Sequence, residues 1–141
     1  MHKPDRLVYL SSGMHTGGDL NLDDPQWSGR RWNGSRAYAD TKLQDVLLAF
    51  GVAGRWPDVL SNAVAPGWVS TRMGGPGASD DLGQGHLTQA WLAVSDDAEA
   101  RVTGRYFYHQ RVSDVNPAAR DAELQDRLLD YCRELSGVAL G

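Results

Sequence analysis

The feature that most constrains the fold of this chain is an alternation of short apolar segments with longer segments of helical periodicity. The segments from Arg6 to Ser11 and from Val59 to Val64 are short apolar runs, typical of strands buried on both faces. Between them, the segment from Ser35 to Arg55 has apolar residues at three-to-four spacing, which predicts a helix capped by Ser35. Its expected buried face consists of Leu43, Val46, Leu47 and Phe50.

The same order of elements continues toward the C-terminus. His86 to Val94 is expected to form a second helix, Gly104 to Tyr108 a third strand, and Asp121 to Leu135 a last helix that ends at Gly137. The stripe expected to be buried on the last helix consists of Leu124, Leu128, Cys132 and Leu135. This order predicts an α/β fold, a partial Rossmann-type parallel sheet of about three strands with flanking helices, in a single domain over residues 1–141.

Two glycine-rich segments separate these elements. Gly13 to Gly34 is rich in glycine, aspartate and asparagine and is predicted to be a long loop. Gly74 to Gly85 is predicted to be a loop on the substrate side of a site. Loops of this length are uncommon in compact domains and often have a function.

Composition narrows the class of protein. A hydrophobic content of 41% and a charged content of 23% are ordinary for one globular domain. The apolar runs are far shorter than the roughly 20 residues that span a bilayer, and the polar start does not resemble a secretory leader, so no membrane partner and a cytoplasmic location are expected. The net charge of −4, without a dense basic run, argues against nucleic acid as a partner.

Metal and disulfide chemistry find little support in the sequence. Cys132 is the only cysteine, which excludes an internal disulfide and a multi-cysteine zinc site. His15, His86 and His109 are too scattered to form a metal-ligand pattern and are predicted to be surface residues. No metal site is therefore predicted.

Tyr38 and Lys42 lie four residues apart on the first predicted helix, so both side chains project from the same face. A phenol ordinarily titrates near pH ~10, and a neighbouring ammonium group favours the phenolate. Such a pair can exchange protons with a substrate. The spacing alone also fits two solvated helix residues, so the surrounding sequence must decide between these interpretations.

Two further segments lie where strands are expected to end. Ser11 and Ser12 close the first strand, and the carboxyl edge of a parallel sheet is where such folds bind ligands. The segment Pro66-Gly67-Trp68-Val69-Ser70-Thr71 follows the second strand. Because glycine has no side chain, its turn lets the backbone approach a flat ring closely.

Taken together, these segments resemble the short-chain dehydrogenase/reductase family. The strand ending in Ser-Ser-Gly, the helix with Tyr-Ala-Asp-Thr-Lys and the turn Pro-Gly-Trp-Val-Ser-Thr match that family in order and residue type. The long insert between serine and tyrosine, with Gly104-Arg105-Tyr106-Phe107 and Pro117-Ala118-Ala119-Arg120-Asp121, is similar to its retinol-dehydrogenase-like branch. The match covers nearly the whole chain.

The resemblance implies a role for each matching residue. Tyr38 would be the general acid/base, Lys42 would favour its phenolate and hold the nicotinamide ribose, and Ser12 would polarise the substrate, with Ser11 as the fallback. The implied cofactor is NAD or NADP. The implied cofactor-binding residues are Tyr38, Lys42, Pro66, Gly67, Val69 and Thr71, with Thr71 near the carboxamide.

The family also begins with a strand and a glycine-rich turn that receives the pyrophosphate. Gly74-Gly75-Pro76-Gly77 does not replace this turn, because its spacing does not fit the dinucleotide fingerprint. The N-terminal dinucleotide-binding strands are therefore expected to be absent, leaving the C-terminal catalytic half. The expected function is that of a truncated NAD(P)-dependent oxidoreductase that interconverts a carbonyl and an alcohol, with little activity alone.

Two alternatives remain open. The chain could be a non-redox small-molecule-binding or interaction subunit that binds no cofactor, or a cofactor-free acid/base enzyme that uses Tyr38 and Lys42. A half sheet would also expose an unpaired strand edge, so a homo-oligomer or a partner chain that covers this edge is expected. The expected substrate in the redox case is a small carbonyl or alcohol compound.

Overall fold

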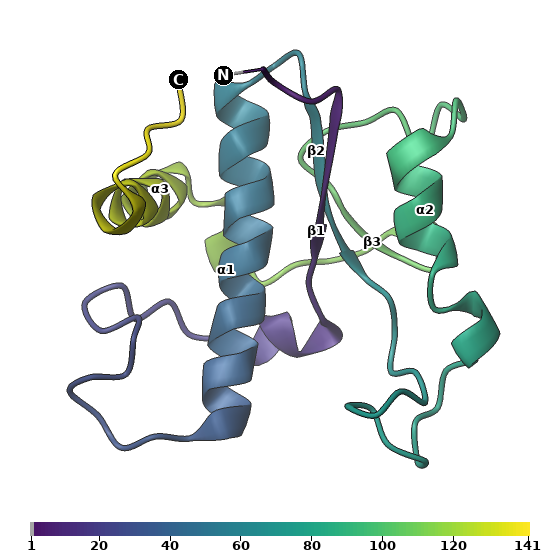
Figure 1. The fold of residues 1–141 in the computed structure, drawn as a ribbon, viewed down its shortest axis with the longest axis horizontal. Coiled ribbons are helices and arrows are strands. Elements are labelled where there is room, and N and C mark those ends of the chain that lie inside the picture. The colour runs from purple at the N-terminus through teal and green to yellow at the C-terminus, as the bar shows by residue number, and fades with distance from the viewer. Residues whose placement is uncertain (1) are drawn as a thin grey trace.

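The computed structural model describes residues 2–141 as an open sheet with helices on both faces (Figure 1). The strands are β1 (Arg6–Leu10), β2 (Leu60–Ala65), β3 (Tyr106–Tyr108) and β4 (Arg111–Val112), in the spatial order β1-β2-β3-β4. The first three are parallel, and β4 is antiparallel to β3. The predicted α/β class is confirmed, with one short strand more than expected.

The fourth strand arises from a tight turn that the sequence does not signal. His109 and Gln110 have φ angles of 48° and 60°, a left-handed conformation that two-residue hairpin turns require. Such turns usually contain asparagine or glycine, and neither is present here. The backbone N–H of Gln110 donates to the buried hydroxyl of Thr88, which helps to hold this turn.

The helices lie in two layers. Figure 1 shows α1 (Gly34–Arg55) and α3 (Ala122–Ser136) on one side of the sheet and α2 (Leu87–Val94) on the other. Asn33, not Ser35, caps α1, because its side chain accepts the backbone N–H of Arg36. The predicted loop from Gly13 to Gly34 also begins with a short 3₁₀ helix, η1 (Gly13–Gly17).

Strand residues alternate between two apolar layers. Ala63 and Tyr106 face α1, whereas Val64 and Phe107 pack with Leu92 of α2. The four predicted core residues of α1 are all buried: Leu43, Val46, Leu47 and Phe50. A fully buried hydrogen bond, from the Ser61 hydroxyl to the Ala49 carbonyl, ties β2 to α1.

The last helix follows the prediction except at its end. Leu128 is buried, and Leu124 and Cys132 pack against the core. Leu135 is 61% exposed, so its expected burial is wrong, because the buried residues of α3, Leu128 and Leu129, lie in the middle of the helix and not in its last turn. Gly137 ends α3 in a left-handed conformation, as predicted. Among residues 2–141, no helix combines the length and apolarity needed to cross a bilayer.

Candidate active site

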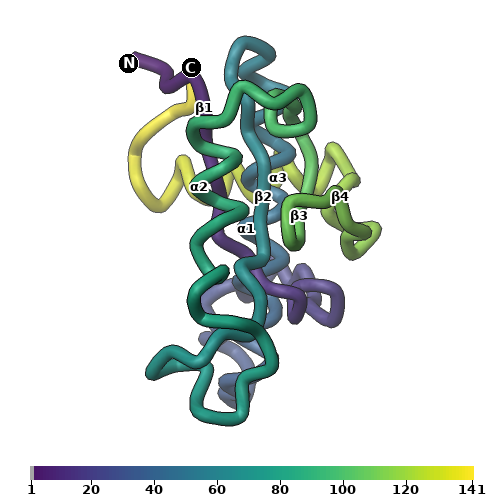
Figure 2. Tube along the Cα trace, turned by 90° about the vertical axis from the view of Figure 1, so that its right-hand side faces the viewer, coloured from purple at the N-terminus to yellow at the C-terminus, as the bar shows by residue number. Residues whose placement is uncertain are grey.

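The carboxyl ends of β1 and β2 lie beside the first turns of α1. Figures 1 and 2 show both strands running toward the end of the molecule at which α1 begins. A cavity of about 960 Å³ opens there, lined by the segments that follow β1 and β2, by α1 and by β3. Parallel α/β sheets generally bind their ligands at this edge.

Tyr38 and Lys42 both line this cavity from α1. The ammonium nitrogen of Lys42 lies 5.8 Å from the centroid of the Tyr38 ring. The same nitrogen donates to the carbonyl oxygen of Leu10 at 2.9 Å and to a carboxylate oxygen of Asp45 at 3.1 Å. An ammonium group has three N–H donors, so these two bonds leave one for a ligand.

Asp45 is a member of this cluster that the sequence analysis did not single out. It lies one helical turn beyond Lys42, a spacing that pairs side chains on a helix surface. Burial raises the pKa of the Asp45 carboxyl group, and the hydrogen bond and charge of Lys42 partly offset this effect. The i, i+3 spacing was the available sequence signal.

The two serines after β1 have different surroundings. Ser11 is buried, and its hydroxyl donates to the backbone carbonyl of Lys42 at 2.8 Å. The hydroxyl oxygen of Ser12 accepts the backbone N–H of Met14 at 3.2 Å, which leaves the hydroxyl proton free to donate. Ser12 is therefore the better placed of the two to donate to a ligand in the cavity.

The turn after β2 forms another wall of the cavity, to which Pro66, Gly67, Val69 and Thr71 all contribute. Gly67 has a φ angle of 102°, which side chains strongly disfavour. Thr71 accepts the backbone N–H of Gly74 through its hydroxyl oxygen. The structure thus brings every predicted site residue to one cavity.

Asp80, from a later segment of the chain, holds the turn after β2 through a contact that the sequence did not indicate. Its carboxylate accepts the backbone N–H of Trp68 at 2.6 Å and the hydroxyl of Tyr108 at 3.2 Å. Desolvation, together with the charge and hydrogen bond of Asp80, raises the pKa of the Tyr108 hydroxyl. The segment that contains Asp80 therefore joins the turn to the end of β3.

The prediction that His15 is a surface residue is wrong. Its side chain has 0% exposure and lies edge-to-face with Tyr106, with 4.6 Å between the ring centroids. One ring nitrogen lies 2.9 Å from the carbonyl oxygen of Ser12, and the other accepts the backbone N–H of Asn116. Two polar backbone partners make this burial possible, and they become neighbours only through the tertiary fold.

The residues that line the large cavity fit the nicotinamide and ribose end of a dinucleotide. The free donor of Lys42 suits ribose hydroxyl groups, and the backbone at Gly67 is open to a flat ring. In the part of the chain that the structure describes, no strand leads into a helix through a Gly-x-Gly-x-x-Gly turn of the kind that binds a pyrophosphate.

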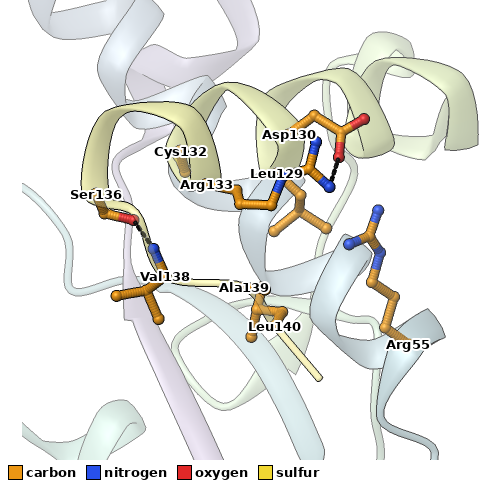
Figure 3. A pocket seen from close by; sticks show the side chains of 9 residues that line it. All are labelled: Arg55, Leu129, Asp130, Cys132, Arg133, Ser136, Val138, Ala139 and Leu140. Carbon is orange, nitrogen blue, oxygen red and sulfur yellow. Dashed lines mark hydrogen bonds and ion pairs between the residues drawn. The ribbon is translucent and has the colours of Figure 1, made fainter.

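A second, smaller cavity of about 240 Å³ lies near the C-terminus (Figure 3). Arg55, at the last turn of α1, lines it together with Leu129 and Cys132 of α3. Tyr38 and Arg55 are 17 residues apart on α1, which separates them by about 25 Å along the helix, so the two cavities lie toward opposite ends of α1. The small cavity is separate from the Tyr38 cluster.

Known proteins that resemble this chain are mostly oxidoreductases. An uncharacterized oxidoreductase from Emericella nidulans is 36% identical over 145 residues, which cover 99% of this chain and 53% of the relative. The short-chain dehydrogenase chyC from Penicillium rubens is 31% identical over 144 residues, covering 99% and 55%. Retinol dehydrogenase 13 from Mus musculus is 27% identical, covering 97% and 47%.

The chain spans about half the length of these curated relatives, and the matched part is their C-terminal half. No family model matches the chain. A crystal structure of an uncharacterized protein from Mycobacterium paratuberculosis has the same fold, with a TM-score of 0.80 at 22% identity over 97% of this chain and 52% of the other.

Proposed function

Because the chain belongs to the short-chain dehydrogenase/reductase family, we propose that it carries the proton-transferring half of an NAD(P)-dependent oxidoreductase. The reaction would interconvert a carbonyl group and an alcohol. The observation that carries this proposal is that Ser12, Tyr38 and Lys42 line one cavity at the carboxyl ends of two parallel strands.

The roles follow from the contacts of each side chain. In the reductive direction, the hydroxyl proton of Ser12 would bond to the carbonyl oxygen of the substrate and polarise it. Tyr38 would transfer its phenolic proton to that oxygen, and the Lys42 ammonium group would stabilise the resulting phenolate. The chemistry that NADH or NADPH would supply when bound is a hydride for the carbonyl carbon. Proton transfer in the opposite direction serves alcohol oxidation.

The test uses dihydronicotinamide riboside, a hydride donor that has the ribose but no pyrophosphate or adenosine. We expect the purified chain to catalyse slow reduction of aldehydes and ketones by this donor. Tyr38→Phe should lower the rate about 100-fold or more, because it removes the proton donor. Tyr131→Phe, which removes a phenol on α3 outside the cavity, is the matched control and should keep the parent rate. Equal rates for the two variants would contradict the proposal.

Full dinucleotides provide a separate measurement. Fluorescence titration with NADH and NADPH should show negligible affinity, because the described residues include no pyrophosphate-binding turn. Trp68 lines the cavity and provides the optical signal. Micromolar binding would contradict the view that part of the dinucleotide site lies outside this chain.

A non-redox binding function is the second candidate. Large apolar side chains that line the cavity are exposed, among them Leu10, Met14, Trp68 and Met73. Such a surface suits an apolar small molecule without any reaction. If the riboside assay shows no turnover while an apolar carbonyl compound binds and quenches the fluorescence of Trp68, this function is favoured.

We also propose that another strand covers β1. In the described part of the chain, β1 pairs with β2 alone, so one row of its backbone groups has no sheet partner. A second copy of the chain or a separate partner could supply this strand. Sedimentation of the purified chain at several concentrations would detect self-association, and a strictly monomeric chain would exclude the second copy.

A further inference from the structure

His15 is the most completely buried titratable side chain near the candidate site, and the proposed reaction gives it no role. It follows Ser12 by three residues in η1, the short helix at the carboxyl end of β1 (Figure 1). Both ring nitrogens have backbone partners, at Ser12 and Asn116. This arrangement joins two segments that are about a hundred residues apart in the sequence.

These partners fix the protonation state of the ring. The backbone N–H of Asn116 can only donate, so Nε2 must accept with its lone pair at 3.2 Å. Nδ1 therefore carries the proton and donates to the carbonyl oxygen of Ser12 at 2.9 Å. A charged imidazolium would place two N–H groups opposite each other at Asn116.

The contact with Ser12 acts on the residue proposed to polarise the substrate. The Ser12 carbonyl accepts both the backbone N–H of His15, at 3.0 Å, and its Nδ1–H. The Ser12 hydroxyl oxygen accepts the N–H of Met14. These three bonds hold the residue between the end of β1 and the start of η1, with its hydroxyl proton free for the cavity.

The other side of the ring is held as firmly. The Asn116 side chain donates to the carbonyls of Thr16 and Gly18, which both follow His15 within three residues. Tyr106, which lines the cavity, packs edge-to-face on the imidazole. The ring therefore has one position and one tautomer, and its Nδ1–H points at Ser12.

We propose that His15 is a positioning residue for Ser12: its neutral imidazole, anchored by Asn116, holds the Ser12 carbonyl so that the hydroxyl faces the cavity. This inference rests on the proposed function, in which Ser12 polarises the substrate. The contact itself is a property of the chain and can be tested without turnover.

Two substitutions separate the two hydrogen bonds of the ring. In His15→Asn the side-chain amide can donate from close to the position of Nδ1 but cannot reach Asn116. In His15→Gln the longer side chain can offer an oxygen near the position of Nε2 but loses the donor to Ser12. Both lose the aromatic contact with Tyr106, so that loss cannot account for a difference between them.

The first measurement is hydrogen exchange of the Met14 amide, whose N–H bonds to the Ser12 hydroxyl. We expect His15→Asn to keep the parent exchange rate and His15→Gln to exchange about tenfold faster, the effect of losing one hydrogen bond. Thermal unfolding identifies folded variants. If both unfold, the same comparison is made on Asn116→Ala, which removes the side-chain anchor and should also speed Met14 exchange.

The second measurement is the riboside assay. If the parent chain is active, His15→Gln should lower kcat with little change in KM. His15→Asn should keep a kcat close to that of the parent. Equal Met14 exchange in the two variants would overturn the inference. A parent chain without turnover would overturn the proposed function instead, and the exchange result alone then decides the role of His15.

Discussion

The ammonium group of Lys42 lies 3.1 Å from the carboxylate of Asp45, one turn further along the same helix. Both side chains are half-buried, and the Lys42 nitrogen lies 5.8 Å from the centroid of the Tyr38 ring. The charge available to Tyr38 is therefore shared with a carboxylate that burial disfavours in its ionised form. Asp45 thereby affects both the stability of the fold and the orientation of Lys42.

Asp45→Asn should change stability in a pH-dependent way. Because the pKa of Asp45 is raised in the folded chain above 3.8, the folded state holds this proton more tightly than the unfolded state. The Asp45 contribution to stability therefore falls as pH rises through the window between 3.8 and the raised value. The free energy of unfolding of the variant relative to the parent should increase over that window. Denaturant titrations at a series of pH values would show this, and a constant difference would contradict it.

His15 should produce the opposite trend with acid. Burial lowers the pKa of the imidazole below 6.5, so the unfolded state takes up its proton first as pH falls. The contribution of His15 to the free energy of unfolding should be fully present above pH 6.5. It should decrease as the pH falls below 6.5 toward the lowered pKa of the folded state. The His15→Asn variant should lack this component. Parallel urea titrations of the two proteins test it, and identical pH profiles would argue against a buried neutral ring.

Gly67→Ala should damage the turn after β2 for two reasons. The φ angle of 102° strains any side chain, and an added Cβ would lie 2.5 Å from an Asp80 carboxylate oxygen. Gly75→Ala is the matched control, because its φ of 75° gives strain while nothing lies within 4 Å of the added atom. We expect a loss of about 1 kcal/mol or more at Gly75 and a larger one at Gly67. Equal losses in thermal unfolding would show that Asp80 does not constrain the turn.

Leu47→Ala should cost about 2–5 kcal/mol, because its side chain is fully buried between α1 and the sheet and leaves a cavity. Leu135→Ala removes the same atoms from an exposed helix position and should change stability by less than about 0.5 kcal/mol. Chemical denaturation of the pair measures the difference. Similar losses of stability in the two variants would mean that α1 does not pack against the sheet as the structure shows.

The parts of the fold that follow from local pattern were predictable. The buried face of α1 is visible as a helical repeat, and Gly137 ends α3 as its conformation allows. The turn at His109 and Gln110 was not predictable, because its left-handed residues are held by tertiary contacts such as that with Thr88. The cap of α1 was misplaced because both Asn33 and Ser35 are good capping residues.

For the site, short motifs identified residues that the structure brings to one cavity, and their roles stay predictions. The sequence could not show Asp80 or Asn116, because their contacts join distant segments. It also misled on His15, since a single histidine carries no pattern that distinguishes a buried residue from an exposed one. Burial of such a residue depends on partners that only the fold supplies.

The carbonyl of Leu10 is the last one on β1, and it bonds to Lys42 instead of to a neighbouring strand. The backbone N–H of Ser11 points to β2, so this carbonyl faces the unpaired side of β1. A chain that added alongside β1 over its full length would offer a backbone N–H to the same oxygen, which has two lone pairs and can accept both bonds. A strand added to β1 and the Lys42 ammonium group would therefore meet at this one oxygen, and the end of the new strand would lie beside the lysine that lines the cavity.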